Sequence, residues 1–207
     1  PEAINRTLNC IICFLDIVQH WQVSERVFVA TSAVREASNR EDFLVLAEEK
    51  AGQPIEILSG QREGELSYLG AKAGLGLKAN PVLVDVGGGS TEISYQSRRM
   101  RSVSVPVGAV RAWEADWDET EIKVLLKAEL PANLGSKSSP LVLVGGTATS
   151  LVAIKKGLTI YDPAEVQGEE LTLSEIIALY EQLDHLTVEE RRLLPGLQPE
   201  RADIIVK

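Results

Sequence analysis

Apolar residues recur every three to four positions through the first 20 residues, and this spacing predicts an amphipathic helix that is already under way at the first residue. Short apolar and β-branched runs at 26–30 and 54–58 predict two strands. Helical patterns follow them at 39–49 and 61–69. The apolar positions of the opening helix are Ile4, Leu8, Ile11, Ile12, Leu15 and Val18.

The rest of the chain continues to alternate between strand and helix patterns. Strands are predicted at 81–84, 93–95, 103–107 and 140–144, and helices at 116–130, 148–155 and 172–183. The helix at 172–183 opens with a Thr-x-x-Glu capping box, and Thr187 opens another. Residues 136–139 read as a polar linker, and 204–207 read as the start of a strand or helix. The Gly- and Ala-rich residues 71–80 suggest a boundary between two halves.

The strand at 81–84 ends in Asp85 and Val86 and then in three glycines, Gly87, Gly88 and Gly89. Residues without Cβ allow a large anion to approach main-chain N–H groups, as a phosphate-binding turn requires. An extended pattern resumes at Ile93, so the glycines join two strands, which argues against a Walker loop or a Rossmann turn because both open a helix. A glycine-rich hairpin without a ligand remains an alternative.

Polar groups flank these glycines on both sides. Ser90 and Thr91 add hydroxyl donors, and Asp85 and Glu92 add carboxylates, with no lysine nearby. A divalent cation is therefore the expected partner for a phosphate group at this loop.

A second strand ends in glycines at Gly145 and Gly146, before the helix at 148–155. One such junction is weak evidence for a ligand site, but two on parallel strands are harder to obtain by chance. The pair suggests two sides of one phosphate-binding cleft.

Arg35 and Glu63 are two further candidates. Arg35 follows the strand at 26–30, at the edge where α/β sheets collect ligands, although it could instead pair with Glu36 or Glu41. Glu63 lies in the first turn of a helix, where a carboxylate also serves simply to stabilise the helix end.

Composition narrows the function classes. The chain has 207 residues, of which 44% are hydrophobic and 25% charged, as in an ordinary globular protein. Its net charge of −9 argues against a nucleic-acid surface, and no apolar stretch is long enough to predict a membrane span. No signal peptide is recognisable at Pro1, and we expect a cytoplasmic protein that binds neither nucleic acid nor membrane.

The two cysteines, Cys10 and Cys13, are three residues apart in the opening helix. A zinc site would lack further ligands, and a redox pair would lack its strand-to-helix context. We therefore expect buried or half-buried thiols without chemistry.

Seven segments, taken in order and at their spacing, resemble the exopolyphosphatase/guanosine pentaphosphate phosphatase family over nearly the whole chain. They read ATSAVREASNR, LSGQREGEL, VDVGGGSTE, SVPVGAVR, LVGGTATSL, YDPAEVQG and EERRLLPGLQPERADII. The resemblance implies an α/β fold of the actin-like ATPase type, related to sugar kinases, Hsp70 and ribonuclease H, with two half-domains around a cleft. Residues 1–80 would be the remnant of the N-terminal half and 81–207 the C-terminal half.

The resemblance also implies Mg²⁺-dependent hydrolysis of a terminal phosphoanhydride. The substrate would be inorganic polyphosphate or, as the alternative, guanosine pentaphosphate; a non-catalytic actin-like binding module is a further alternative. It leaves a homodimer open as the assembly.

Individual residues take their expected roles from the matching motifs. Glu63 corresponds to the family's catalytic carboxylate, and Arg35 to an arginine that contacts phosphate. Asp85 and Glu92 would lie near the metal. The phosphate-binding residues would be Gly87, Gly88, Gly89, Ser90 and Thr91 in the second phosphate loop, with Gly145 and Gly146 in the third glycine turn.

Some features depart from the family pattern. The first phosphate loop would lie upstream of residue 1, and both ends of the chain read as truncated. Gln167 stands where a histidine is usual, which removes a titratable group but keeps a hydrogen-bonding one. We therefore expect the 207 residues alone to be nearly inactive. We also expect the face formed by Ile4, Leu8, Ile11 and Leu15 to lack the strands it would pack against, so that it must find a partner, be covered by other residues or promote self-association.

Overall fold

The computed structural model describes residues 2–130, 134 and 139–207, and they form two compact units, Pro1–Ser59 and Gly60–Lys207. The predicted linker at 136–139 lies outside the described residues apart from Ser139. None of the described helices is both long enough and apolar enough to cross a membrane.

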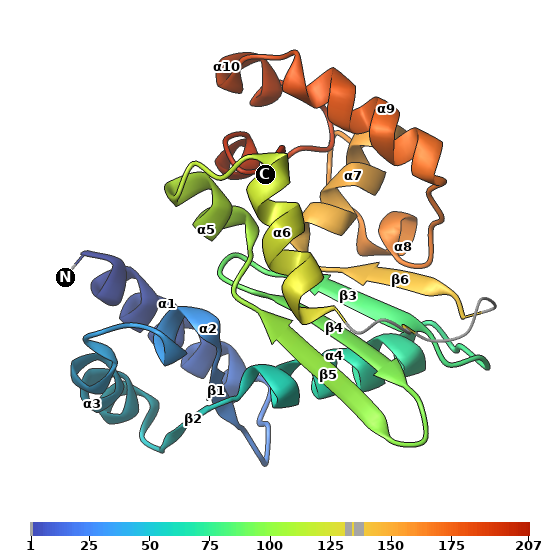
Figure 1. Ribbon diagram of the computed structural model, residues 1–207. Coiled ribbons are helices and arrows are strands. Elements are labelled where there is room, and N and C mark those ends of the chain that lie inside the picture. Colours follow the sequence, from blue (N-terminus) through green and yellow to red (C-terminus); the bar gives the residue numbers. More distant parts are fainter. Residues whose placement is uncertain (1, 131–133, 135–138) are drawn as a thin grey trace. The chain divides into compact units, whose positions relative to one another are not determined.

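The first unit is built on two helices and a small parallel sheet (Figure 1). Helix α1 (Glu2–His20) packs against α3 (Arg40–Ala51), and β1 (Phe28–Ala30) pairs with β2 (Ile55–Ile57). A short helix, α2 (Ser32–Arg35), follows β1. The predicted helices and strands of this region are thus confirmed.

One prediction about α1 is wrong. The face expected to lack a partner is packed into the core of this unit, with Leu8 and Ile11 buried and Ile4 and Leu15 partly buried against Phe43 and its neighbours. The reason is the nearby α3, which the pattern could not place beside α1. Burial of this face stabilises the helix, since most helical stability in proteins comes from packing of an amphipathic face.

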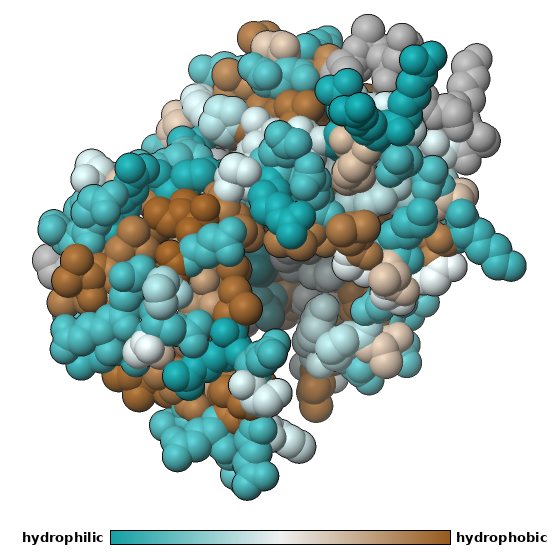
Figure 2. Space-filling model, turned by 90° about the horizontal axis from the view of Figure 1, so that it is seen from below, coloured by the Kyte–Doolittle hydropathy of each residue, from teal (hydrophilic) through white to brown (hydrophobic). Residues whose placement is uncertain are grey.

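The other side of α1 is exposed and apolar. Phe14 and Ile17 lie there, and Trp21, directly after the end of the helix at His20, is 74% exposed. Cys10 and Cys13 are exposed free thiols, so the expectation of buried thiols is also wrong. Figure 2 shows hydrophobic residues gathered on the surface of this unit, in the left part of the view.

The second unit is organised around a four-stranded sheet in the order β5-β4-β3-β6. Strands β3 (Val82–Val86), β4 (Thr91–Gln96) and β5 (Met100–Val105) form an antiparallel meander. Strand β6 (Leu141–Val144) pairs with β3 in parallel, with Asp85 opposite Val144. The prediction that the glycines join two strands, and that two glycine turns follow parallel strands, is confirmed.

Helices cover both faces of this sheet (Figure 1). Helix α4 (Gly60–Gly74) lies on one face, against β4 and β5. Helix α6 (Glu119–Glu129) packs against the other, where Val82, Ile93 and Val105 form a core. Because side chains alternate along a strand, Ser94 faces α4 while its neighbour Ile93 faces α6.

A helical region completes the unit, and its predicted capping boxes at Thr172 and Thr187 are both present. The helices are α5 (Ala109–Glu114), α7 (Gly146–Lys156), α8 (Pro163–Val166), α9 (Leu173–Asp184), α10 (Val188–Arg191) and the 3₁₀ helix η1 (Pro199–Arg201). Residues 204–206 form turns rather than a strand or a helix.

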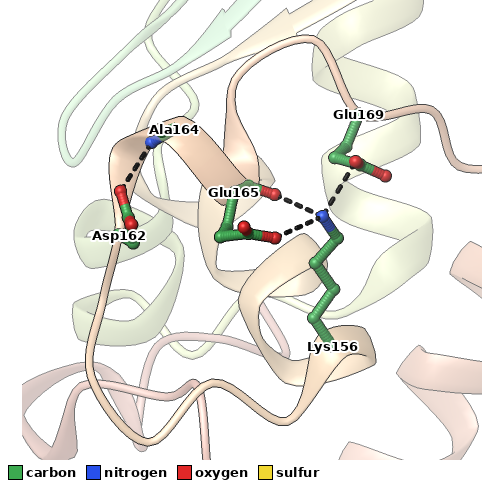
Figure 3. Close-up of polar contacts among 5 residues, drawn as sticks. All are labelled: Lys156, Asp162, Ala164, Glu165 and Glu169. Atoms are coloured by element: carbon green, nitrogen blue, oxygen red, sulfur yellow. Dashed lines mark hydrogen bonds and ion pairs between the residues drawn. The ribbon is translucent and has the colours of Figure 1, made fainter.

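Lys156 joins α7 to the segment that contains α8 (Figure 3). Its Nζ donates to the Glu165 carbonyl at 2.6 Å and to the Glu169 carboxylate at 2.8 Å. The Asp162 side chain accepts a hydrogen bond from the Ala164 amide and so caps the N-terminus of α8. Gln167 donates to the Gly74 carbonyl at 3.2 Å, so the residue that replaces the usual histidine does make a hydrogen bond, to the end of α4.

Helix α4 continues past residue 69 into the Gly- and Ala-rich stretch, to Gly74, and it belongs to the second unit. Along the chain, the boundary between the two compact units therefore falls between Ser59 and Gly60. The division of the fold into halves at residue 80 remains a prediction, because a compact unit is not the same thing as a half-domain.

Candidate active site

Strand alternation places two predicted carboxylates on one face of the sheet. Asp85 lies near the end of β3, Glu92 lies near the start of β4, and the two are direct partners in the antiparallel register. Both point to the face that α4 covers, since Ser94, two residues after Glu92, meets α4 at Gly64. Glu63, the third predicted carboxylate, precedes Gly64 on that helix.

The close approach of α4 depends on Gly64. A Cβ atom at this position would lie 2.6 Å from the Ser94 Oγ and 3.1 Å from the Glu92 Cβ, and it would collide with the Ser102 Oγ. The missing side chain therefore lets the first turns of α4 lie directly on the sheet. This brings Glu63 close enough to Glu92 for their negative charges to interact.

Glu92 is a buried carboxylate, only 1% exposed. The Ser104 Oγ, on the facing position of β5, donates to its Oε1 at 2.7 Å. Burial raises the pKa of the Glu92 carboxyl, and the negative charges of Glu63 and Asp85 raise it further, while hydrogen bonds from Ser104 and Ser90 partly offset these effects.

Asp85 lies beside both α4 and the glycine turn at Gly145 and Gly146. The Ser67 Oγ, one helical turn after Glu63, donates to its Oδ2 at 2.7 Å. A Cβ atom on Gly145 would lie 3.3 Å from its Oδ1 and 2.5 Å from the Val86 carbonyl oxygen. Gly145 also has a φ of 98°, so both its backbone conformation and its surroundings require glycine.

The glycine loop 87–90 is held in place by the segment that follows β5. The Ala109 amide donates to the Gly87 carbonyl at 3.0 Å, and the Val110 amide donates to the Gly88 carbonyl at 2.9 Å. The Arg111 Nε donates to the Gly89 carbonyl at 2.7 Å. The loop is thus ordered through its carbonyl groups.

Two predicted phosphate-binding residues stand apart from this arrangement. Thr91 is buried, and its hydroxyl donates to the Val107 carbonyl at 2.6 Å, on the face opposite Asp85 and Glu92, so the geometry gives its predicted role no support. Arg35 lies in the first unit, where its Nη1 donates to the Leu58 carbonyl at 2.8 Å and its Nη2 lies 3.8 Å from the Glu36 carboxylate. Its contact with phosphate stays a prediction.

Asp85 and Glu92 are the predicted ligands of a divalent cation, which prefers oxygen ligands. Within the part of the chain that the structure describes, no group of three or more His, Cys, Asp or Glu side chains is arranged to hold a metal. Mg²⁺ at phosphoryl-transfer sites needs only one or two carboxylates besides water and substrate phosphates. Asp85 fits this requirement, because it is half-buried and one of its oxygens lies beside the glycine turn at Gly145. Glu92 fits it less well, because it is buried and already accepts a hydrogen bond from Ser104.

Three residues that support the site were not singled out by the sequence reasoning. Ser67 and Ser104 orient the carboxylates of Asp85 and Glu92, and Arg111 holds the Gly89 carbonyl. Ser67 could have been found from its place four residues after Glu63 on the same helix face. Ser104 becomes apparent only from the strand register.

The comparisons with known proteins agree along the whole chain. A model of the Ppx/GppA phosphatase family matches residues 1–207. Exopolyphosphatase 2 of Mycobacterium tuberculosis is 30% identical over an alignment that covers 99% of this chain and 70% of that protein.

Solved structures give the same result. A crystal structure of the Aquifex aeolicus member of the Ppx/GppA family is 27% identical, with a TM-score of 0.78, and the match covers all of this chain and 71% of the other. An exopolyphosphatase from Cytophaga hutchinsonii shares the fold with a TM-score of 0.83 at 23% identity, over all of this chain and 72% of the other. The predicted α/β fold class is confirmed, since the fold is that of the solved Ppx/GppA structures, the family whose resemblance implied the actin-like ATPase type. The chain belongs to the Ppx/GppA phosphatase family.

Proposed function

We propose that this protein removes the terminal phosphate from inorganic polyphosphate, with Glu63 as the general base. The observation that carries the proposal is the gathering of Glu63, Asp85 and Glu92 where α4 meets the ends of β3 and β4, next to the glycine loop. Similarity to an exopolyphosphatase at 30% identity supports polyphosphate as the substrate.

Each residue of the site would have its own role in such a reaction. Glu63, half-buried in the first turn of α4, would accept the proton of the attacking water. The loop amides and those of Gly145 and Gly146 would bind phosphate oxygens, and Arg35 would bind a further pair of oxygens in a bidentate fashion. Asp85 would hold Mg²⁺, which when bound neutralises phosphate charge, with Glu92 nearby. Ser67 and Ser104 keep the two carboxylates oriented.

Substitution of Glu63 tests the assignment. Glu63→Gln keeps the size of the side chain but cannot accept a proton, so we expect phosphate release from long-chain polyphosphate to fall by about 10² or more. Glu65→Gln is the matched control, because Glu65 lies on the same helix but is not one of the three gathered carboxylates. Its side chain instead accepts a hydrogen bond from Gln61 at 3.0 Å. Equal rates for Glu63→Gln and the unchanged protein would remove Glu63 from the mechanism.

Guanosine pentaphosphate is the alternative substrate, since it offers the same terminal phosphoanhydride to the same loops. Values of kcat/KM for the two substrates, measured side by side, decide between them. A binding module without catalysis is the other alternative, and detectable Mg²⁺-dependent phosphate release rejects it.

Several further expectations keep the status of predictions. They are a cytoplasmic location and weak activity of the 207 residues by themselves, and a homodimer stays open as the assembly. Activity assays on protein whose intact mass equals the 22.5 kDa of the 207-residue sequence test the expected weak activity.

A further inference from the structure

Residues 107–111 pack against the glycine loop. A Cβ atom on Gly108 would lie 2.5 Å from the Gly88 carbonyl carbon and 2.6 Å from the Gly89 nitrogen. Backbone therefore packs directly on backbone at this point. The three loop carbonyls, of Gly87, Gly88 and Gly89, all accept hydrogen bonds from residues 109–111.

This arrangement sets the direction of the loop amides. In a trans peptide unit the carbonyl of one residue and the amide of the next point in opposite directions. Since the three carbonyls point toward residues 109–111, the amides of Gly88, Gly89 and Ser90 point away from that segment. Successive amides aimed to one side form an anion-binding concavity.

The three carbonyls are held in two different ways. Gly87 and Gly88 are bound by main-chain amides, which belong to the start of α5 and do not depend on side-chain identity. Gly89 is bound by a side chain, the half-buried Arg111, through Nε at 2.7 Å. Glycine peptide units turn easily because both signs of φ are accessible. Loss of the Arg111 bond would therefore free the Gly89–Ser90 unit to rotate.

We propose that Arg111 is a positioning residue of the phosphate loop, which holds the Gly89 carbonyl back so that the Ser90 amide faces the bound phosphate. Rotation of this unit would turn a carbonyl oxygen toward an anion and remove a donor at once. The inference rests on the proposed function only in taking the loop ligand to be a phosphate chain.

Two substitutions separate the hydrogen bond from the charge. Arg111→Gln places an N–H donor at the position of Nε, because the two side chains have the same number of bonds up to that nitrogen. Arg111→Met places a methyl group there. Both remove the positive charge. Arg98→Met is the control, because Arg98 is exposed in the β4–β5 hairpin, at the opposite end of the strands from the loop.

The experiment measures binding of tripolyphosphate with Mg²⁺ to the full 207-residue chain, together with NMR signals of the Gly88, Gly89 and Ser90 amides. We expect Arg111→Met to weaken binding about tenfold and to shift or broaden these amides without ligand, as the loss of a charge-assisted hydrogen bond would do. Arg111→Gln should restore most of the affinity. Arg98→Met should change neither readout.

Other outcomes overturn the proposal or assign failure elsewhere. Equal loss in Arg111→Met and Arg111→Gln indicates a role for charge alone and overturns the positioning role, as do unchanged loop amides in Arg111→Met. General loss of the amide spectrum in both variants, with Arg98→Met intact, shows a structural role and also overturns it. An unchanged chain that binds tripolyphosphate without hydrolysing polyphosphate leaves the comparison of variants readable, so the role of Arg111 is tested separately from the proposed function. An unchanged protein that does not bind tripolyphosphate overturns both.

Discussion

Single glycines decide how closely helix α4 approaches the sheet. A Cβ atom at Gly64 would meet the hydroxyls of Ser94 and Ser102, which are hydrogen-bonded to each other at 2.9 Å, so a side chain there has no space to occupy. Gly70 lies on the same helix, and a Cβ atom there would meet nothing within 4 Å. The same substitution should therefore have opposite effects at these two positions.

Gly64→Ala is expected to destabilise the second unit by about 1–3 kcal/mol, since an extra methyl group in a packed interface forces backbone shifts. Gly70→Ala should stabilise it by about 0.5–1 kcal/mol, because alanine is the better helix former in open space. Urea unfolding of the two variants gives both values. Equal stability of the two would mean that α4 does not press on the sheet at Gly64.

Residue-scale chemistry was predictable from sequence only where a motif carries it. The glycine loop, Asp85, Glu92 and Glu63 stand in local motifs, and the structure brings these three carboxylates together. The support from Ser104 and Arg111 depends on strand register and on packing between distant segments, which no local pattern contains. The roles themselves await the experiments above.

At the scale of elements, the start of α9 combines a capping box with an ion pair from α7. Glu175 accepts hydrogen bonds from the Thr172 amide and hydroxyl, and its other oxygen lies 2.9 Å from the Lys155 Nζ. The bond to Lys155, followed by those to Thr172, lowers the pKa of the Glu175 carboxyl from 4.5 to about 2. The carboxylate therefore links two helices.

A pH dependence follows from this shift. A carboxyl whose pKa falls on folding stabilises the protein above its unfolded pKa, and this contribution is lost as the pH falls through its folded pKa. Glu175→Gln should thus be less stable than the unchanged protein at pH 7, and the two should converge between pH 4.5 and about 2. Thermal unfolding across this range measures it, with Glu170→Gln, outside the capping box, as control. A difference that persists unchanged at pH 2 would contradict the linkage.

Element type was predictable because local periodicity decides it, whereas element faces were not. The 3.6-residue pattern of α1 marks Leu8 and Ile11 as apolar, but only the position of α3 shows that they are covered. Exposed Phe14, Ile17 and Trp21 carry the same pattern signal as their buried neighbours. Periodicity gives the direction of a face and says nothing about its partner.

At the scale of the whole molecule, the chain contains separate apolar cores. Leu8, Phe43 and Ala47 belong to the cluster of the first unit, and the clusters built on Ile93, Val152 and Leu183 belong to the second. Units with cores of their own can open separately, so a single unfolding free energy need not describe the molecule.

Leu8→Ala is therefore expected to act on one unit. Deleting a buried leucine side chain costs about 2–5 kcal/mol, and Leu8 contributes only to the cluster that α1 and α3 share. Hydrogen exchange should then quicken for amides of α1 and α3, while strands β3 and β4 keep their protection. Leu83→Ala, in the centre of the second unit's sheet and 0% exposed, should produce the reverse pattern. Equal loss of protection throughout the chain in both variants would show that the two units unfold as one.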